Sequence, residues 1–313
     1  MAVYTSIQEP ELADVVADYG LGGLLGVTPV PFGSVNTNYI LATAGGQVVL
    51  RIDEVKGELD HKRELDLLLY LRRENFPCPE ALIDRKGRHY RMLGGKCLSV
   101  YRYVAGTQCA AGALTVPQLE DAGRVLADLH LVGRGYKKGI DNRFGFERLM
   151  QLYRLVRAQL PPHFRRIVRT LDDEIGFLRE YLESKLPKGI IHGDLFEDNL
   201  IYDGERVAVV LDFEAAARGK FVFDVATLVN ALCYVPGPGY DIRRFDAVLA
   251  GYEHVRPLSL AEWDAFPNEL RFSAFRFTVT RLRDFTLRPA TAQARVDKDF
   301  TEFYERLQVL RRE

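Results

Sequence analysis

The sequence predicts an α+β protein of two lobes, a small antiparallel sheet with one helix and a larger, mostly helical lobe. In the first third, short β-branched and aromatic runs are separated by glycine and proline, which is typical of strands and turns. After Gly106, apolar residues recur at helical spacing, and only two short β-type runs interrupt them. We therefore expect the sheet lobe over residues 1–103 and the helical lobe over 104–313.

The sheet lobe is expected to begin with a helix, because Ser6 and Glu9 form a capping box ahead of apolar residues at helical spacing, up to Gly20. The helix among its strands, over Glu58–Glu74, carries a leucine stripe and stops at a turn that contains two prolines. Strands are expected at Val27–Val30, Tyr39–Ala42, Val48–Ile52, Ala81–Asp84, Tyr90–Leu93 and Leu98–Val104.

The helical lobe is expected to start with an amphipathic helix over Thr115–Val132, whose apolar residues share one face. Two short β-type runs, Ile190–Ile191 and Val207–Leu211, lie in the middle of this lobe. The other helical segments are expected at residues 146–159, 163–184, 221–234, 241–255 and 260–285.

Composition argues against several classes of function. The chain has 42 basic and 43 acidic residues, so it lacks the basic excess that a large nucleic-acid interface needs. The uncharged stretch Leu21–Leu50 is broken by glycine and proline and does not read as a membrane span. The N-terminus lacks the basic-then-apolar order of a signal peptide. We expect a cytoplasmic protein that binds neither nucleic acid nor membrane.

The strongest motif is the run from Ile190 to Ile201, Ile-Ile-His-Gly-Asp-Leu-Phe-Glu-Asp-Asn-Leu-Ile. It places Asp194 five positions before Asn199, the spacing of a kinase catalytic loop, and the later apolar run leads into Asp212-Phe-Glu. Phosphoryl transfer needs a carboxylate to accept the proton of the attacking hydroxyl and oxygen ligands for Mg²⁺. The alternative is a turn in which Asp and Asn only cap helices.

The motif resembles the loop of the aminoglycoside-phosphotransferase/choline-kinase superfamily, which has His-Gly-Asp where protein kinases have His-Arg-Asp, and the resemblance covers essentially the whole chain. The stretches Gly251–Leu258 and Arg276–Leu282 resemble the homoserine kinases of this superfamily. The resemblance implies a protein-kinase-like fold and ATP-dependent phosphorylation of a small alcohol, most of all L-homoserine in threonine biosynthesis. It also implies ATP and Mg²⁺ as cofactors.

By the same resemblance, Asp194 is the catalytic base, and Asn199 and Asp212 are the metal ligands. His192 and Asp224 are expected to support the catalytic loop. Because the carboxylate already serves as the base, a structural role fits His192 better than proton transfer.

The resemblance also indicates how the nucleotide is bound. The loop between the first two strands would fold over the ATP phosphates, although an ordinary hairpin turn is the alternative. Arg51 stands where the family has lysine. Arginine can hold a phosphate bidentately, and the alternative, with equal weight, is a surface arginine that binds no phosphate. The residues implied in nucleotide binding are Gly33, Ser34, Asn36, Asn38, Arg51, Glu64, Tyr101 and Tyr103.

The acceptor site is expected on the last long helix, where Arg276 and Arg281 border an apolar surface. An arginine is costly to bury without an anion, and the carboxylate of homoserine would supply one. Glu214 or Asp284 could then receive the ammonium, and Asn230 belongs to a stretch shared with homoserine kinases. The alternative is that the two arginines pair with Asp284 and Glu269 to hold the helix in place.

Two other functions stay open at this point. One is a kinase of the same fold that acts on choline or an aminoglycoside, although a polycation pocket would need several carboxylates where this chain has paired arginines. The other is an inactive nucleotide-binding partner protein. The intact set of Asp194, Asn199 and Asp212 counts against it.

Overall fold

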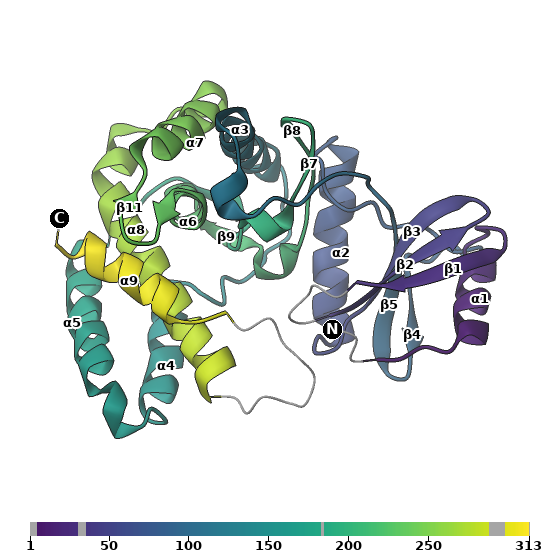
Figure 1. The fold of residues 1–313 in the computed structure, drawn as a ribbon, viewed down its shortest axis with the longest axis horizontal. Helices are drawn as coiled ribbons and strands as arrows, with labels where there is room; N and C mark the ends of the chain where they lie inside the picture. The colour runs from purple at the N-terminus through teal and green to yellow at the C-terminus, as the bar shows by residue number, and fades with distance from the viewer. Residues whose placement is uncertain (1–4, 31–35, 183–184, 288–297, 313) are drawn as a thin grey trace. The chain divides into compact units, whose positions relative to one another are not determined.

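The structure is a computed structural model that describes residues 5–30, 36–182, 185–287 and 298–312 (Figure 1). It divides into two compact units, whose boundary along the chain lies between Ala105 and Gly106. The order expected from the sequence, an antiparallel sheet followed by a mostly helical part, is confirmed. No helix in the described ranges is both long and apolar enough to cross a membrane.

Unit 1 is built on a five-stranded antiparallel sheet with strand order β1-β2-β3-β5-β4. Its described residues form two helices, α1 before the sheet and α2 among its strands, as expected, and α1 packs against the sheet. The elements of unit 1 are α1 (Glu9–Asp18), β1 (Leu24–Pro29), β2 (Thr37–Thr43), β3 (Gly46–Ile52), α2 (Glu58–Arg73), β4 (Tyr90–Leu93) and β5 (Lys96–Arg102).

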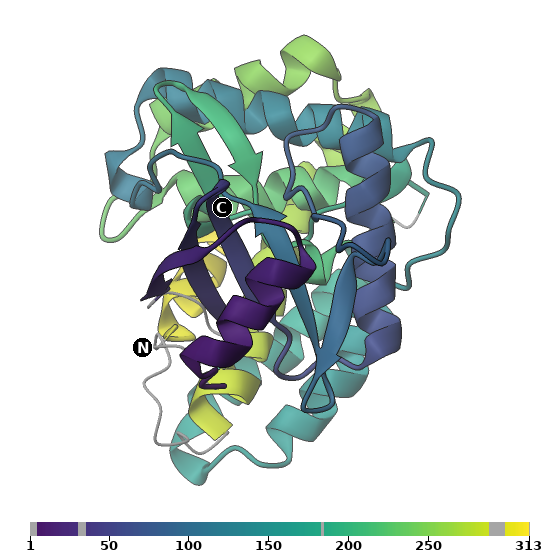
Figure 2. The same ribbon diagram turned by 90° about the vertical axis from the view of Figure 1, so that its right-hand side faces the viewer.

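The two helices of unit 1 cover opposite faces of the sheet (Figure 2). Val15 and Val16 of α1 pack against Leu50 of β3 in one buried cluster. Because side chains alternate across a strand, the neighbouring Arg51 points to the other face, where it meets Glu64 of α2. The sheet therefore buries an apolar core on one side and presents Arg51 on the other.

Two local predictions in unit 1 were wrong. The first helix is capped by Gln8 with Glu11, two residues later than the expected box at Ser6 and Glu9. The segment expected as a strand at Ala81–Asp84 makes only one isolated bridge, at Ala81. The Asp84 carboxylate accepts the N–H groups of Lys86 and Arg88, so a side-chain-capped turn replaces the strand ladder.

Unit 2 is mostly helical, with three two-stranded sheets, β6-β9, β7-β8 and β10-β11. Its helices are α3 (Val116–Gly133), α4 (Phe146–Arg157), α5 (Arg165–Tyr181), α6 (Phe221–Leu232), α7 (Ile242–Val255), α8 (Leu260–Arg281) and α9 (Thr301–Leu310). Its strands are β6 (Lys188–Ile191), β7 (Leu200–Asp203), β8 (Arg206–Val210), β9 (Ala217–Lys220), β10 (Tyr234–Val235) and β11 (Gly239–Tyr240).

Helices α3 and α7 pack backbone to backbone through glycines. A Cβ at Gly251 would lie 1.8 Å from the Glu120 carbonyl oxygen, and one at Gly123 would lie 2.0 Å from that of Val248. Only glycine fits at such a crossing. This approach brings the hydroxyl of Tyr252 in α7 within 2.7 Å of Nδ1 of His130 in α3.

Candidate active site

The candidate catalytic residues lie where β6 and β8 end and β7 begins. β6 ends at Ile191 just before His192, while the β7–β8 hairpin begins after Asn199 and ends before Asp212. Hairpin pairing brings the two ends of this segment together, because the Leu211 N–H donates to the Asn199 carbonyl at 2.8 Å. The fold therefore places the three motif positions, 194, 199 and 212, at one edge of unit 2.

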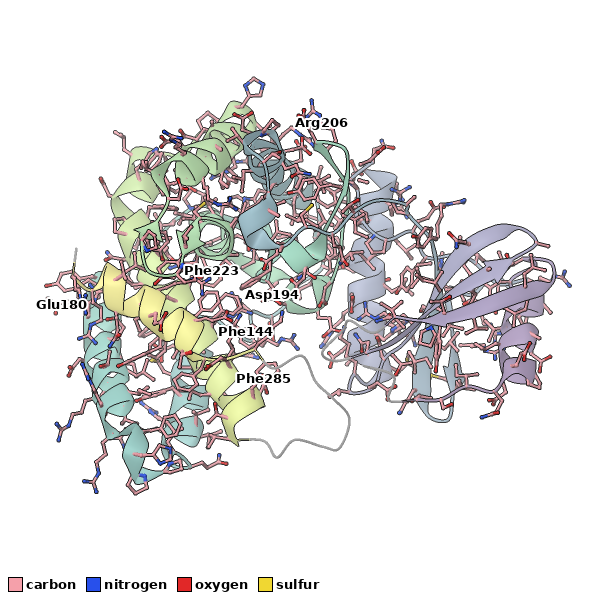
Figure 3. All side chains as sticks on the ribbon, viewed as in Figure 1. Phe144, Glu180, Asp194, Arg206, Phe223 and Phe285 are labelled. Atoms are coloured by element: carbon pink, nitrogen blue, oxygen red, sulfur yellow. The ribbon has the colours of Figure 1, made fainter. Side chains whose placement is uncertain are left out.

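Asp194 is fixed through its backbone, while its side chain stays accessible. The Asn199 Nδ2 donates to the Asp194 carbonyl at 2.8 Å, and the Asp194 N–H donates to His192 Nδ1 at 3.2 Å. Its side chain, labelled in Figure 3, keeps 33% of its surface exposed, which leaves the carboxylate accessible to a substrate hydroxyl. The Asp194 Oδ1 lies 3.9 Å from Nη1 of Arg276.

Both ring nitrogens of His192 make hydrogen bonds. Its Nε2 lies 2.8 Å from the Leu211 carbonyl oxygen and must donate, whereas its Nδ1 accepts from the Asp194 N–H. One nitrogen donates and the other accepts, so the hydrogen bonds themselves select the tautomer. His192 thereby links the catalytic loop to the residue that precedes Asp212, which is the bracing role proposed for it.

Asp224, at the start of α6, holds the backbone of the same loop. Its two carboxylate oxygens accept the N–H groups of His192 and Gly193, each at 2.7 Å. Burial alone would raise the pKa of Asp224, but hydrogen bonds from His130 and the Gly193 N–H, with the charge of nearby groups, hold this pKa below its usual value. A buried anion thus anchors the loop that carries Asp194.

A buried chain of polar side chains continues behind Asp224. His130 Nε2 lies 3.1 Å from Asp224, and His130 Nδ1 lies 2.7 Å from the Tyr252 hydroxyl. Arg256 donates to that hydroxyl at 2.9 Å and pairs with Glu262 at 2.7 Å. The stretch Gly251–Leu258, which resembles homoserine kinases, therefore contributes two members of the chain that supports the loop.

Burial lowers the pKa of His130 despite the opposing effect of Asp224, so the ring stays neutral in the folded protein. The unfolded ring has a pKa of about 6.5, so below that pH the unfolded chain binds a proton that the folded one does not. We expect the free energy of unfolding to fall as pH drops from about 6.5, by at most about 1.4 kcal/mol per pH unit from this residue. The contribution of Asp224, whose folded pKa is lowered, should be lost only below about pH 4.

Urea unfolding between pH 7.5 and 5 measures this effect. A His130→Gln variant should be less stable at pH 7.5 than the wild type but lose less stability on acidification. Parallel pH dependence in the two proteins would contradict a buried neutral His130.

Asp212 adopts a left-handed backbone conformation, with φ 59° and ψ 69°. A non-glycine residue in this region is strained, at a cost of about 1–3 kcal/mol, and such strain clusters at functional sites. Asp212 directly follows Leu211, whose backbone N–H donates a hydrogen bond to the Asn199 carbonyl. The Nδ2 of Asn199 donates to the Asp194 carbonyl, so its Oδ1 is the atom that can bind a metal ion.

These two residues fit Mg²⁺ as a pair of hard oxygen donors. Mg²⁺ in kinases takes one or two protein ligands and completes its shell with phosphate oxygens and water. Within the described ranges, no group of three or more His, Cys, Asp and Glu side chains forms an all-protein metal site. The donor set of Asn199 and Asp212 suits a metal that arrives with a nucleotide.

Unit 1 contains the predicted pair of Arg51 and Glu64 inside a larger ionic cluster. Arg51 lies 3.2 Å from Glu64 and 3.0 Å from Asp53. Burial opposes ionisation of Asp53, but the hydrogen bond from His61 and the charge of Arg51 hold its pKa at about 2. Lys56 also pairs with Glu64. Lys56 was missed from the sequence, because it lies after the strand and only the fold brings it to Glu64.

The structure describes only some of the other residues predicted to bind the nucleotide. Gly33 and Ser34 lie outside the described residues. Asn36 is buried, and Asn38 donates to its carbonyl at 3.5 Å. Tyr101 is buried near the end of β5, and Tyr103 follows that strand half-buried.

The structure gives the predicted acceptor arginines different partners from those considered in the sequence. Arg276 is buried and donates to the Gly193 carbonyl, and burial lowers its pKa to about 10. Arg281 pairs with Glu302 at 2.7 Å and donates to the Asp299 carbonyl at 2.8 Å. The alternative pairing with Asp284 and Glu269 was wrong, because Arg283 pairs with Asp284 and Lys220 pairs with Glu269.

The remaining candidates for acceptor binding lie in different surroundings. Asn230 is fully buried in α6; it donates to the Leu270 carbonyl at 3.0 Å and accepts from the Tyr240 hydroxyl, so it serves packing inside unit 2. Glu214 lies two residues after Asp212, and its carbonyl accepts from Arg143 at 2.9 Å. Arg143 was also missed from the sequence, where it stands in an unremarkable loop.

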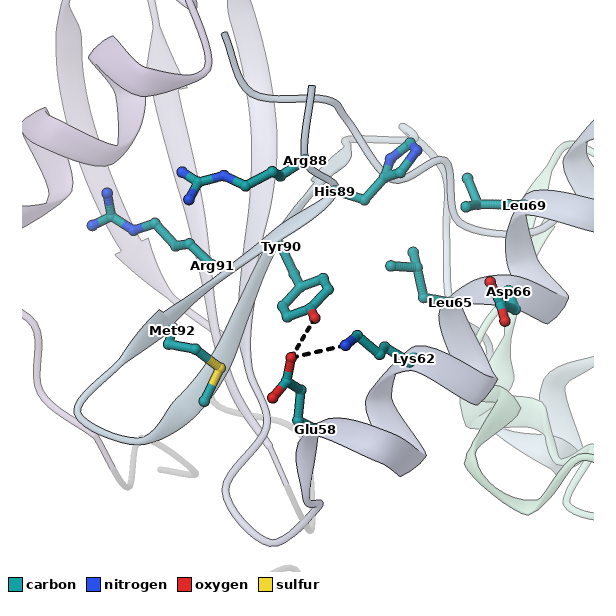
Figure 4. A pocket seen from close by; sticks show the side chains of 10 residues that line it. All are labelled: Glu58, Lys62, Leu65, Asp66, Leu69, Arg88, His89, Tyr90, Arg91 and Met92. Carbon is teal, nitrogen blue, oxygen red and sulfur yellow. Dashed lines mark hydrogen bonds and ion pairs between the residues drawn. The ribbon is translucent and has the colours of Figure 1, made fainter. Parts of the chain in front are cut away.

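A pocket of about 510 Å³ in unit 1 contains none of the predicted site residues (Figure 4). It lies between α2 and β4, and three of its polar side chains contact one another: Glu58 accepts from the Tyr90 hydroxyl at 2.6 Å and pairs with Lys62 at 3.0 Å. We assign no role in catalysis to this pocket.

The amino-acid sequence of the chain is similar to those of known phosphotransferases. A family model described as the phosphotransferase enzyme family matches residues 26–258. A homoserine kinase of Caulobacter sp. (strain K31) is 34% identical over 314 residues, which covers 99% of this chain and 97% of that protein. A homoserine kinase of Methylobacillus flagellatus is 33% identical over 91% of this chain and 88% of its own length.

One solved structure illustrates the likeness of the fold. An amicoumacin kinase in complex with AMP-PNP and Ca²⁺ has a TM-score of 0.72 over 98% of this chain and 93% of its own, at 17% identity. At that identity the likeness concerns the fold alone.

Proposed function

The chain belongs to the phosphotransferase enzyme family and, within it, to the homoserine kinases; from this membership we propose that it transfers the γ-phosphate of ATP to the hydroxyl of L-homoserine. The resemblance drawn from the sequence is thereby confirmed at the level of the family. The observation that carries the chemistry is the meeting of Asp194, Asn199 and Asp212 at one edge of unit 2.

In the proposed reaction, the hydroxyl oxygen of the acceptor attacks the γ-phosphorus, and the bond from that phosphorus to the β–γ bridging oxygen breaks. ADP leaves, and the hydroxyl proton passes to the Asp194 carboxylate. The Asp194 side chain is 33% exposed, which gives the hydroxyl access, and the hydrogen bonds from the Asp194 N–H to His192 and from Asn199 to the Asp194 carbonyl fix the backbone of this residue. Asp194 therefore acts as base and as an orienting group.

The enzyme uses ATP with a divalent metal ion, and we propose that the ion is Mg²⁺, held by Asn199 and Asp212. When bound, Mg²⁺ neutralises the negative charge that gathers on the β- and γ-phosphates. Asn199 also donates to the Asp194 carbonyl, so one side chain ties the proposed metal position to the proposed base.

We propose that unit 1 binds the nucleotide. Arg51, oriented by Glu64 and Asp53, would contact the phosphates, and Lys56 on the same glutamate adds a second cation. This pairing resembles the Lys–Glu pair of protein kinases with arginine in place of lysine. Gly33, Ser34, Asn36 and Asn38 would belong to the phosphate loop, and Tyr101 and Tyr103 to the adenine site.

A panel of alcohols tests the choice of acceptor. ATP-dependent phosphorylation with Mg²⁺ should give the highest kcat/KM with L-homoserine among L-homoserine, choline, hydroxylysine, methylthioribose and kanamycin. A higher kcat/KM with choline or kanamycin would favour the rival kinase activity. Nucleotide binding without phosphorylation of any alcohol would favour the inactive partner protein.

A further inference from the structure

We propose that Arg143 binds the carboxylate of the acceptor, so that the enzyme selects an amino-acid alcohol over a simple amino alcohol; this rests on the proposed function. Arg143 lies on the loop that precedes α4, and its side chain is exposed.

Two contacts hold the Arg143 guanidinium beside the catalytic residues. Its Nη2 donates to the Glu214 carbonyl at 2.9 Å, two residues beyond Asp212. Its guanidinium carbon lies 5.0 Å from the centre of the Phe144 ring. Together these contacts direct the exposed guanidinium toward the turn that carries Asp212.

The Phe144 ring connects Arg143 to the catalytic base. The same ring lies 4.3 Å from the guanidinium carbon of Arg276, whose Nη1 is 3.9 Å from Asp194. Figure 3 labels Phe144 and Asp194. Arg143 is close enough to lower the pKa of Arg276, in addition to the larger effect of burial. Two cations therefore share one aromatic side chain next to Asp194.

The arginines of this region differ in the partners of their charges. Arg281 pairs with Glu302, and Arg283 pairs with Asp284. Arg276 donates to the catalytic loop and has Asp194 as its nearest carboxylate. Arg143 makes no ion pair within the described part of the chain; its one hydrogen bond goes to a backbone carbonyl.

The Arg143 guanidinium is thus able to bind an anion through its remaining N–H donors. A guanidinium carries five N–H donors in one plane, and the Glu214 carbonyl takes one of them. The remaining donors can hold a carboxylate bidentately. Homoserine has such a carboxylate, whereas choline and aminoglycosides do not and would meet two positive charges there. The same feature accounts for acceptance of homoserine and rejection of cationic alcohols.

The test compares L-homoserine with 3-amino-1-propanol, which keeps the amine and the hydroxyl but lacks the carboxylate. Arg143→Ala should lower kcat/KM for L-homoserine about 10- to 100-fold, the usual effect of losing hydrogen bonds to a charged group. Its kcat/KM for 3-amino-1-propanol should stay the same or rise, because the substitution removes a positive charge that disfavours a cationic alcohol. Arg143→Lys should recover part of the loss, because lysine keeps the charge without the fork.

Arg148→Ala is the matched control, since Arg148 is an exposed arginine on α4 that pairs with Asp141. It should leave kcat/KM for both alcohols unchanged. An Arg143→Ala enzyme that loses equally on both alcohols, or keeps the preference for L-homoserine, overturns the role of Arg143 alone. A wild type that uses 3-amino-1-propanol as well as L-homoserine overturns the proposed function together with it.

Discussion

Replacing Asp194 by asparagine is expected to lower kcat about 10²- to 10⁴-fold. Asparagine keeps the shape of the side chain but cannot accept the proton of the attacking hydroxyl. The backbone bonds that fix residue 194, from Asn199 and to His192, do not involve its side chain and should persist. ATP binding should therefore change little, which separates a loss of chemistry from a loss of structure.

Asp198→Asn is a matched control on the same loop. Asp198 is exposed and pairs with Lys298 at 2.8 Å, an interaction that should contribute little. Its variant should retain nearly full kcat. An Asp194→Asn enzyme that kept more than about a tenth of wild-type kcat would remove Asp194 from the role of base.

Removing the proposed metal ligands should have the second largest effect. Asp212→Ala should abolish turnover and weaken the metal-dependent part of ATP binding, because one of two hard ligands is lost. Asn199→Ala should instead raise the Mg²⁺ concentration needed for half-maximal rate. Asp212→Asn separates charge from backbone conformation, since asparagine tolerates the left-handed region that Asp212 occupies.

Calorimetry of ATP binding with and without Mg²⁺ measures the effect directly. In the wild type, Mg²⁺ should strengthen binding, and this gain should shrink in Asp212→Ala and in Asp212→Asn. Unchanged metal-dependent binding in the Asp212 and Asn199 variants would show that the ligands lie elsewhere.

Much of the fold could be predicted from the sequence because local signals and tertiary packing agree. The amphipathic helix expected over Thr115–Val132 is α3, and Leu65, Leu68 and Leu71 of the predicted α2 stripe are buried. β4 has the predicted bounds, Tyr90–Leu93. The elements that were missed, such as α9 (Thr301–Leu310) and the two-residue strands β10 and β11, are short and depend on contacts with the rest of unit 2.

Some residues of the candidate site could be predicted from the sequence, and others could not. Asp194 and Asn199 are separated by five positions, so a sequence motif reveals them, and the backbone bond between Leu211 and Asn199 brings Asp212 close. Arg143, by contrast, reaches Glu214 across 71 positions, and Lys56 and Arg281 find partners that no local pattern specifies. Long-range ion pairs depend on where helices cross, so the partners of the arginines could not be predicted.

The product of the reaction tests the central claim most directly. L-Homoserine with ¹⁸O in its hydroxyl group should be incubated with the enzyme, ATP and Mg²⁺ and the product analysed by ³¹P NMR and mass spectrometry. The account predicts a phosphate ester on the hydroxyl oxygen that retains the ¹⁸O, formed in equal amount with ADP. Phosphate on another atom, loss of the label, or ADP and free phosphate without an ester would contradict it.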